Sequence, residues 1–148
     1  MPRVLLTGMS GTGKSTLAAE LARRGHRTVE TDDDGWHRED GSWHPGRMTA
    51  LLDAHPDLLV VGTADNQGRF YDRFAAVVLL SVPADVVLAR VSTRSTNPYG
   101  RSGEQRAEIL GHLSTVEPLL RRGATLELDG RRPTGELADV VAQLLTSG

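Results

Sequence analysis

The sequence predicts an α/β fold in which a five-stranded parallel sheet carries helices on both faces. Short β-branched runs alternate with longer helical patterns throughout the 148 residues. Two of these runs, Leu58–Val61 and Ala75–Val82, are almost continuously apolar, which is typical of parallel strands covered on both faces. No repeat, linker or low-complexity segment interrupts the pattern, so residues 1–148 are predicted to form a single domain.

The predicted elements follow one another in a regular order along the chain. The first helix has Leu17 and Leu21 on one face and Gly25 beyond its end. The strands are expected at Arg3–Thr7, Thr28–Glu30, Leu58–Val61, Ala75–Val82 and Thr125–Leu128. The helices are expected at Lys14–Arg24, Gly46–His55, Pro83–Val91, Glu104–Leu120 (disturbed at Pro118) and Thr134–Leu145. The polar segment Ser92–Gly103 is expected to be a loop.

Composition excludes several classes of protein. The chain has no cysteine, which rules out a disulfide framework, a thiolate metal site and a thiol nucleophile. No apolar run approaches the ~20 residues that span a bilayer, and the apolar start Val4–Leu6 is too short for a signal peptide. We therefore expect a cytoplasmic monomer or homodimer without membrane contact. The net charge of −2 argues against general electrostatic binding to nucleic acid.

A glycine-rich turn, Gly8–Ser15, matches the phosphate-binding motif G-x-x-x-x-G-K-[ST] in full, between a predicted strand and a predicted helix. Its glycines let the backbone approach an anion, and its N–H groups and helix end present partial positive charge. Lys14, the only lysine in the chain, would reach the β- and γ-phosphates of ATP, and the Ser15 hydroxyl would ligate Mg²⁺. The expected ATP-binding residues here are Gly8, Met9, Ser10, Gly11, Thr12, Gly13, Lys14, Ser15 and Thr16.

This motif predicts the three-layer P-loop NTPase fold, with the strand order 2-3-1-4-5 counted along the chain. The alternative is a glycine-rich turn that binds nothing. GTPases carry a guanine motif with a second lysine, which this chain lacks. Large ATPases place an aspartate at the end of a hydrophobic strand, whereas Leu58–Val61 is followed by Gly62-Thr63-Ala64, with no acid until Asp65. A small kinase is the class that remains.

An acidic cluster, Asp32, Asp33 and Asp34, follows the second predicted strand. In a parallel sheet this strand end lies at the same edge as the P-loop, where open α/β sheets bind ligands. A carboxylate there could accept the proton of an attacking hydroxyl or bind Mg²⁺ through water. The alternative is a solvated loop or a helix cap, but three adjacent carboxylates repel one another, which favours a functional role.

Several further segments match, in sequence order, the motifs of one family of small kinases. They are Glu30-Thr31-Asp32 for an Asp-Thr-Asp motif, the turn at Gly62, Arg90 and Arg94 before Asn97–Gly100, and the tail from Glu117–Arg122 through Leu128–Asp129 to Arg131–Pro133. Together with the P-loop, these segments resemble the shikimate kinase branch of the nucleoside-monophosphate-kinase-like P-loop kinases. The resemblance covers essentially the whole chain and implies a lid at about residues 92–103.

The resemblance also implies roles for individual residues. Asp32 would orient or deprotonate the acceptor hydroxyl, and Glu30 would hold Mg²⁺ through water. The implied catalytic residues are Lys14, Asp32 and Arg94, and the implied metal-binding residues are Ser15, Glu30 and Asp32. The ATP-binding set gains Arg90 over the adenine, Arg132 and Pro133 on its other side, and Arg94, which would fold in with the lid and neutralise charge on the transferring phosphoryl group.

Three departures from the family predict that shikimate is not the substrate. The arginine expected just before Pro118 is replaced by Val116-Glu117. A second substrate-binding arginine has no counterpart unless Arg47 serves, and the three-glycine turn is reduced to Gly62-Thr63-Ala64.

The acceptor site is expected along Asp65–Phe74, which follows the third strand at the ligand edge. Its amides could read a base or sugar hydroxyls, and its arginines could pair with an anion. The alternative is a polar loop whose aromatics pack beneath the next strand; Trp36 and Trp43 could cover a planar acceptor, although a core role is favoured. The expected substrate-binding set is Asp32, Asp34, Arg47, Gly62, Asn66, Gln67, Arg69 and Arg73.

These observations predict an ATP- and Mg²⁺-dependent phosphotransferase that acts on a hydroxyl or phosphate of a small molecule. A nucleoside or nucleotide kinase is one alternative, in which Arg47, Arg69 and Arg73 are the candidates to hold an acceptor phosphate. A nucleotide-binding regulatory protein that has kept its P-loop but lost phosphoryl transfer is the other.

Overall fold

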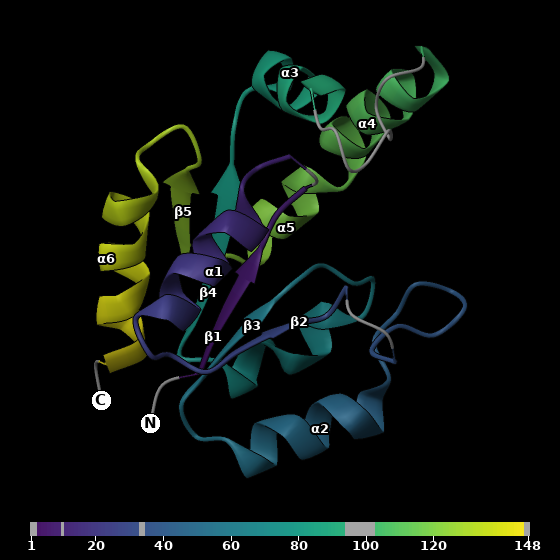
Figure 1. Cartoon of the computed structure of the whole chain (residues 1–148). Coiled ribbons are helices and arrows are strands. Elements are labelled where there is room, and N and C mark those ends of the chain that lie inside the picture. The colour runs from purple at the N-terminus through teal and green to yellow at the C-terminus, as the bar shows by residue number, and fades with distance from the viewer. Residues whose placement is uncertain (1–2, 10, 33–34, 94–102, 147–148) are drawn as a thin grey trace.

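A five-stranded parallel sheet forms the centre of the computed structural model, which describes residues 3–9, 11–32, 35–93 and 103–146 (Figure 1). The strand order β2-β3-β1-β4-β5 confirms the predicted order, and each neighbouring pair is parallel. The strands are β1 (Arg3–Thr7), β2 (Thr28–Glu30), β3 (Leu58–Val61), β4 (Ala76–Ser81) and β5 (Leu126–Asp129). Because β1 lies between β3 and β4, the loop that follows it stands at the middle of the carboxyl edge, where such sheets bind ligands.

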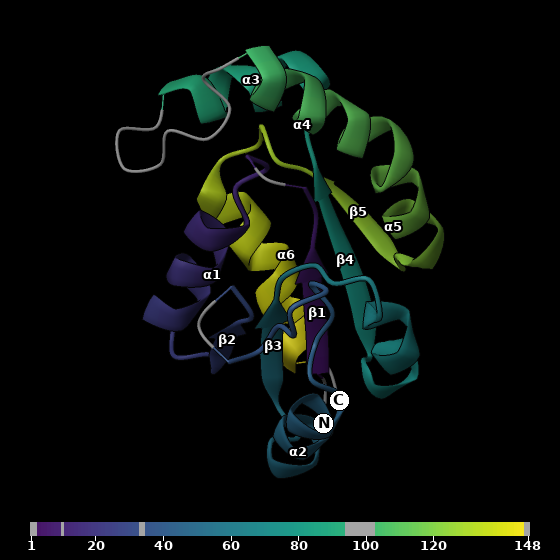
Figure 2. The same ribbon diagram turned by 90° about the vertical axis from the view of Figure 1, so that its right-hand side faces the viewer.

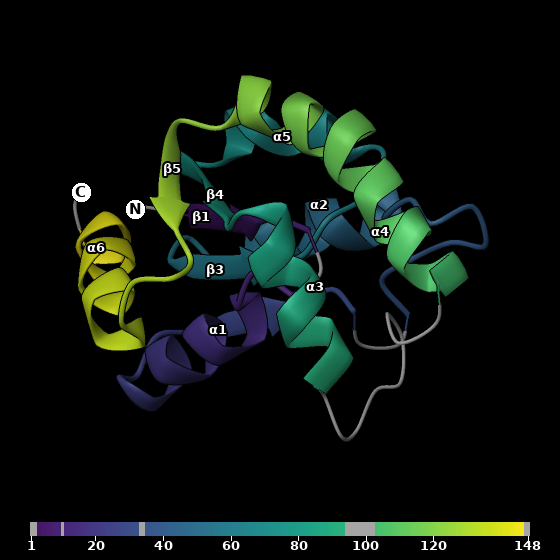
Figure 3. The ribbon, with the colours of Figure 1, turned by 90° about the horizontal axis from the view of Figure 1, so that it is seen from above.

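Helices cover both faces of the sheet and complete the three predicted layers. Figures 1 and 3 show α1 and α6 on one side of the strands, with α2 and α5 on the other, while α3 and α4 stand over the carboxyl ends of the strands. The helices are α1 (Lys14–Arg23), α2 (Pro45–Ala54), α3 (Ala84–Thr93), α4 (Gly103–Thr115), α5 (Glu117–Gly123), α6 (Thr134–Thr146) and the 3-10 helix η1 (Gln67–Arg73). None of these helices, within the described part of the chain, is long and apolar enough to cross a bilayer.

Two apolar cores follow from the alternation of side chains along the strands. Val4 and Leu6 of β1 pack against α1 and α6, whereas Leu5 between them packs against α2, η1 and the two tryptophans. The side chains of β3 and β4 also alternate between the two cores. Both faces of the sheet are therefore apolar, as the continuous hydrophobic runs predicted.

The helix predicted over Glu104–Leu120 is in fact two helices, α4 and α5, which meet at Val116. Pro118 is the cause, because proline lacks the N–H that a continuous helix would need, yet it is accepted in the first turn of a new helix. The segment Gln67–Arg73, for which no helix or strand was predicted, forms η1. The predicted lid falls mostly on residues 94–102, which lie outside the described part of the chain.

Candidate active site

The phosphate-binding loop joins β1 to α1 in a conformation that depends on its glycines. The φ angles of Gly8, Gly11 and Gly13 are 155°, 83° and 101°, all in the region that favours glycine. A side chain at Gly8 would also collide with the carbonyl oxygen of Leu80 on β4. Gly13 is the N-cap of α1 and provides no side-chain hydrogen bond, so the first N–H groups of the helix are left for an anion.

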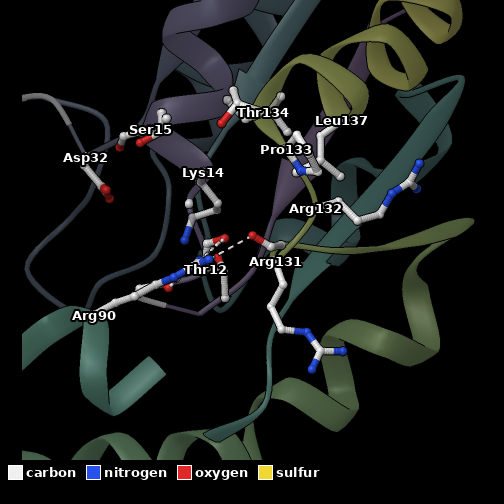
Figure 4. A pocket seen from close by; sticks show the side chains of 15 residues that line it. Thr12, Lys14, Ser15, Asp32, Arg90, Arg131, Arg132, Pro133, Thr134 and Leu137 are labelled. Carbon is white, nitrogen blue, oxygen red and sulfur yellow. Dashed lines mark hydrogen bonds between the residues drawn. The ribbon is translucent and has the colours of Figure 1, made fainter. Parts of the chain in front are cut away.

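Lys14 lies across this loop. Its Nζ donates hydrogen bonds to the carbonyl oxygens of Gly8, at 2.7 Å, and Met9, at 3.0 Å. The Thr12 hydroxyl donates to the same Met9 carbonyl at 2.9 Å, which fixes the turn. Figure 4 shows the Lys14 ammonium beside Thr12, in the cavity that the loop borders. Lys14 thus lines the cavity, and its binding to phosphate stays a prediction.

A cavity of about 620 Å³ opens above the loop and extends to the β5–α6 connection. This volume is of the size that small-molecule sites usually have. Its described charged residues are one carboxylate, Asp32, and four cations from three separate elements, so the cavity suits a polyphosphate. The residues that line it are Gly11, Thr12, Gly13, Lys14, Ser15, Thr16, Leu17, Asp32, Arg90, Gly130, Arg131, Arg132, Pro133, Thr134 and Leu137.

Arg90 of α3 connects the two walls of this cavity. One guanidinium nitrogen donates to the carbonyl oxygens of Gly11 and Thr12, at 3.3 and 3.2 Å, and the other donates to that of Gly130 at 2.9 Å (Figure 4). The arginine therefore bridges the phosphate loop, the helix over the sheet edge, and the connection that leads into α6. Arg132 and Pro133 line the same cavity, and their contact with an adenine stays a prediction.

The wall formed by the β5–α6 connection contains two residues for which the sequence predicted no role in the site, Gly130 and Arg131. A side chain at Gly130 would collide with the Thr12 carbonyl, so glycine allows this connection to pack against the phosphate loop. Arg131 forms an ion pair with Asp129 at 2.7 Å, and its hydrogen bonds lower the pKa of that carboxyl group to about 2. The adjacent glycine and arginines of Gly130–Pro133 were the available signal for this wall.

The acidic residues after β2 reach the same edge of the sheet. The N–H of Thr31 donates to the Val61 carbonyl at 2.8 Å and its hydroxyl donates to the same oxygen at 3.2 Å, which extends the pairing with β3 and holds the following residue, Asp32. Asp32 is exposed and lines the cavity above the phosphate loop, hereafter the nucleotide-sized cavity. Val29 packs into the core on the α2 side, so strand alternation directs Glu30 toward the α1 side, where Ser15 begins the first turn.

Magnesium ions in phosphate sites usually take one or two protein oxygens together with phosphate and water oxygens. The Ser15 hydroxyl and the Asp32 carboxylate border one cavity and fit that requirement. Within the described ranges there is no cluster of three histidine or acidic side chains that would form an all-protein metal site.

Gly62 makes room for a neighbouring residue of the acidic loop. Its φ angle is 149°, and a Cβ built on it would overlap the Thr31 side chain, so the missing side chain is explained by packing within the protein. The next residue, Thr63, shares a hydrogen bond of 2.9 Å with the Thr7 hydroxyl and also donates to the Gly8 carbonyl at 2.9 Å. The turn after β3 thereby supports the phosphate loop.

Two amides expected to read the acceptor are instead used within the fold. Gln67 is 3% exposed; its Oε1 accepts from the Ala64 N–H at 2.9 Å and its Nε2 donates to the Tyr71 hydroxyl at 2.7 Å. The Asn66 side chain accepts from the N–H of Trp43 and donates to its carbonyl, both at 2.9 Å. The role of Asn66 could not be predicted because Trp43 lies 23 residues away, and that of Gln67 because its amide also bonds to Thr7, 60 residues away.

The prediction that Arg73 contributes to the acceptor site is wrong. Arg73 pairs with Asp53 at 2.5 Å, and its carbonyl lies 3.5 Å from a guanidinium nitrogen of Arg3. Arg3 begins β1, so η1 has carried Arg73 from the ligand edge to the opposite edge of the sheet. Arg69, on the same helix, is exposed.

Arg47 of α2 covers the ring of Trp36, with its guanidinium carbon 4.2 Å from the ring centroid. Trp36 is 8% exposed and Trp43 is fully buried, so both tryptophans belong to the core. Ser10, Asp34 and Arg94, which complete the predicted site, lie outside the described residues.

Comparison with known proteins agrees with this geometry. A shikimate kinase from Psychrobacter arcticus is 28% identical over 156 aligned positions, which cover 91% of this chain and 81% of that protein. An HPr kinase/phosphorylase from Lactiplantibacillus plantarum is 36% identical over 67 residues, but these span only 45% of this chain and 21% of the longer relative. The solved shikimate kinase from Acinetobacter baumannii, in complex with shikimate, superimposes with a TM-score of 0.71 at 22% identity, covering 98% of this chain and 93% of that one.

The fold is thus that of the small P-loop kinases, as the family resemblance implied. The sequence profile of the AAA domain family matches residues 4–111, which include the phosphate loop, Asp32 and Arg90. With this match over most of its length, and with the P-loop geometry described above, the chain belongs to the AAA domain family.

Proposed function

We propose that the protein is an ATP- and Mg²⁺-dependent phosphotransferase that acts on a small-molecule acceptor. The observation that carries the proposal is that one cavity is lined both by residues 11–15 of the phosphate-binding loop and by Asp32. A protein that only binds nucleotide needs the loop, whereas transfer also needs a group that orients the acceptor. The relatives with shikimate kinase activity support the same reaction class.

In this mechanism Lys14 leaves the loop carbonyls and binds the β- and γ-phosphates, while the N–H groups of α1 bind phosphate oxygens. The acceptor oxygen forms a bond to the γ-phosphorus as the bond to the bridging oxygen of ADP breaks, and the hydroxyl proton passes to Asp32. When bound, Mg²⁺ would neutralise phosphate charge, with Ser15 and Asp32 as its protein ligands and Glu30 acting through water. Arg90 would cover the base, opposite Arg132 and Pro133.

The acceptor is proposed to bind near Asp32 and Arg47, with contributions from Asp34 and Arg69. Shikimate is not the expected acceptor, because Glu117 stands beside the position where shikimate kinases have an arginine, and its carboxylate is already paired with Arg121 at 3.2 Å. A phosphate-bearing acceptor, as in a nucleotide kinase, would need several cations, and Arg73 lies at the far edge of the sheet. A hydroxyl acceptor without a phosphate group is therefore favoured, and a nucleoside is among these.

The proposal includes a single kinase domain whose lid lies at about residues 92–103 and contains Arg94. It also includes a cytoplasmic location, where ATP is available, and a monomeric or homodimeric state. A regulatory protein that binds nucleotide without transfer is the alternative of another class.

Asp32→Asn separates these functions. ATP turnover would be screened against sugars, nucleosides, nucleotides and aminoglycosides, with mass detection of the product, and the active acceptor used for kinetics. We expect kcat to fall by about 10²–10⁴-fold in D32N, with the calorimetric Kd for Mg-ATP within threefold of wild type.

Asp57→Asn, at the opposite edge of the sheet just before β3, is the matched control and should retain full turnover. The regulatory protein would be favoured over the kinase if the protein bound nucleotide but turned over no acceptor, and if D32N changed no property.

A further inference from the structure

A second cavity, of about 830 Å³, lies beside β4 and β5 beneath α4 and α5. Figure 2 shows these two helices following the β5 side of the sheet, away from α1 and α6. Among the residues that the structure describes, Arg131 alone borders both this cavity and the one above the phosphate loop. In Figure 4 its guanidinium points away from Lys14 and the phosphate loop. The second cavity is therefore a separate site, and it has no role in the phosphoryl transfer proposed above.

The two walls of this cavity have different chemistry. One wall is apolar and includes Val82, Pro83, Leu110 and Leu113. The other consists of charged side chains from α5, β5 and the β5–α6 connection, namely Glu117, Arg121, Glu127, Asp129 and Arg131. A ligand that fits both walls needs a short hydrocarbon body and a charged or strongly polar head.

The charges on the polar wall show which sign the head should have. Arg121 donates to both oxygens of Glu127, at 2.8 and 3.1 Å, and to one oxygen of Glu117, at 3.2 Å. Arg131 is paired with Asp129 at 2.7 Å. Three carboxylates thus face two guanidinium groups, which leaves one negative charge in excess.

The excess charge is located at one atom. Glu117 is 9% exposed, and its Oε2 is shielded from solvent and has no hydrogen-bond partner among the described residues. A buried carboxylate oxygen without a donor is costly, and such atoms in folded proteins usually have a partner. Because the terminal torsion of a glutamate is soft, a small rotation can present Oε2 to the cavity that this residue lines.

We propose that this cavity binds a small primary amine in its ammonium form. The ammonium would donate to Glu117 Oε2, and the hydrocarbon part would lie on the wall formed by Leu110 and Leu113. An anion would meet the excess of carboxylates, and a bare metal ion would find only one oxygen that is not already paired. A neutral alcohol would satisfy the hydrogen bond but not the charge.

The test compares three probes that share one carbon chain: n-butylammonium, n-butanol and butyrate, at constant ionic strength and without nucleotide. Binding would be followed by ¹⁵N chemical shifts of the full chain. We expect saturable shifts of the Leu113 and Ser114 amides with n-butylammonium at millimolar Kd, and at least tenfold weaker binding of the other two.

Two variants locate the ammonium. Glu117→Gln keeps the shape of the side chain and should weaken n-butylammonium binding at least tenfold, whereas Glu104→Gln, an exposed glutamate in the first turn of α4, should bind as wild type does. If E117Q does not fold, Leu110→Ala, at a side chain 44% exposed, should still weaken binding several-fold.

The proposal is overturned by the absence of saturable shifts at Leu113 and Ser114, by equal binding of butanol or butyrate, or by unchanged affinity in E117Q or L110A. None of these outcomes depends on ATP, so they leave the kinase proposal unaffected.

Discussion

The substitution Gly62→Ala tests how the turn after β3 positions the acidic loop. Gly62 has a φ angle of 149°, and an added methyl group would overlap the side chain of Thr31. Thr31 is fully buried and is held to Val61 by hydrogen bonds from its N–H and its hydroxyl, so it has little freedom to move away. The alanine is therefore expected to destabilise the fold and to displace Asp32, the next residue, from its position at the cavity.

The magnitude has two parts. Forcing an extra methyl group into a packed site costs about 1–3 kcal/mol. Holding a residue with a side chain in this backbone region costs about 1–3 kcal/mol more. The free energy of unfolding should fall by the sum of these costs, about 2–6 kcal/mol, which lowers Tm by roughly 5–25 °C in a domain of this size.

Urea unfolding of the wild type, G62A, T31A and the double variant checks this estimate. Thr31→Ala removes the overlapping group and should itself cost about 1 kcal/mol for the lost hydroxyl hydrogen bond. In the T31A background, G62A should be less damaging by about 1–3 kcal/mol, because only the backbone strain remains. Equal costs in the two backgrounds would refute the packing explanation, and wild-type stability of G62A would refute both parts.

Three further predictions concern charged side chains. Lys14→Ala should weaken Mg-ATP binding at least tenfold in calorimetry, because the ammonium lies across the phosphate loop, where it donates to the carbonyl oxygens of Gly8 and Met9. Unaltered affinity would contradict its phosphate role. Arg131 lowers the pKa of Asp129 to about 2, so the contribution of this carboxylate to stability is complete above about pH 4 and is lost as the pH falls through about 2. A D129N variant should therefore show a shallower fall of Tm over this pH range than the wild type. An identical Tm profile would be inconsistent with the ion pair. Arg47→Ala should raise KM for the acceptor several-fold, whereas Arg73→Ala should not, and equal effects would argue against the acceptor position proposed here.

The sheet and the phosphate loop were predictable because their signals are local. Each strand is a short apolar run, and the P-loop motif contains in eight consecutive residues the glycines, the lysine and the hydroxyl that its geometry requires. The strand order was implied by the resemblance to small P-loop kinases, and the structure confirms it.

The acceptor side was less predictable because its contacts join residues far apart in the chain. Gln67 resembled a recognition residue in sequence, but its partners include Thr7 on the central strand, 60 residues away. Arg73 was misplaced because no helix was predicted where η1 runs along the sheet to the opposite edge. Arg131 was named in the sequence but given no role, because its place between the two cavities depends on how closely Gly130 packs against Thr12.

The position of the single lysine has a practical consequence. Since the sequence has no cysteine and only one lysine, a reagent that acylates amines can modify this chain only at Lys14 and at a free α-amino group. Lys14 lines the nucleotide-sized cavity, so a bound triphosphate would shield it from such a reagent. Intact-mass measurement of acylation would then report the occupancy of the site directly, without an engineered label and without knowledge of the acceptor.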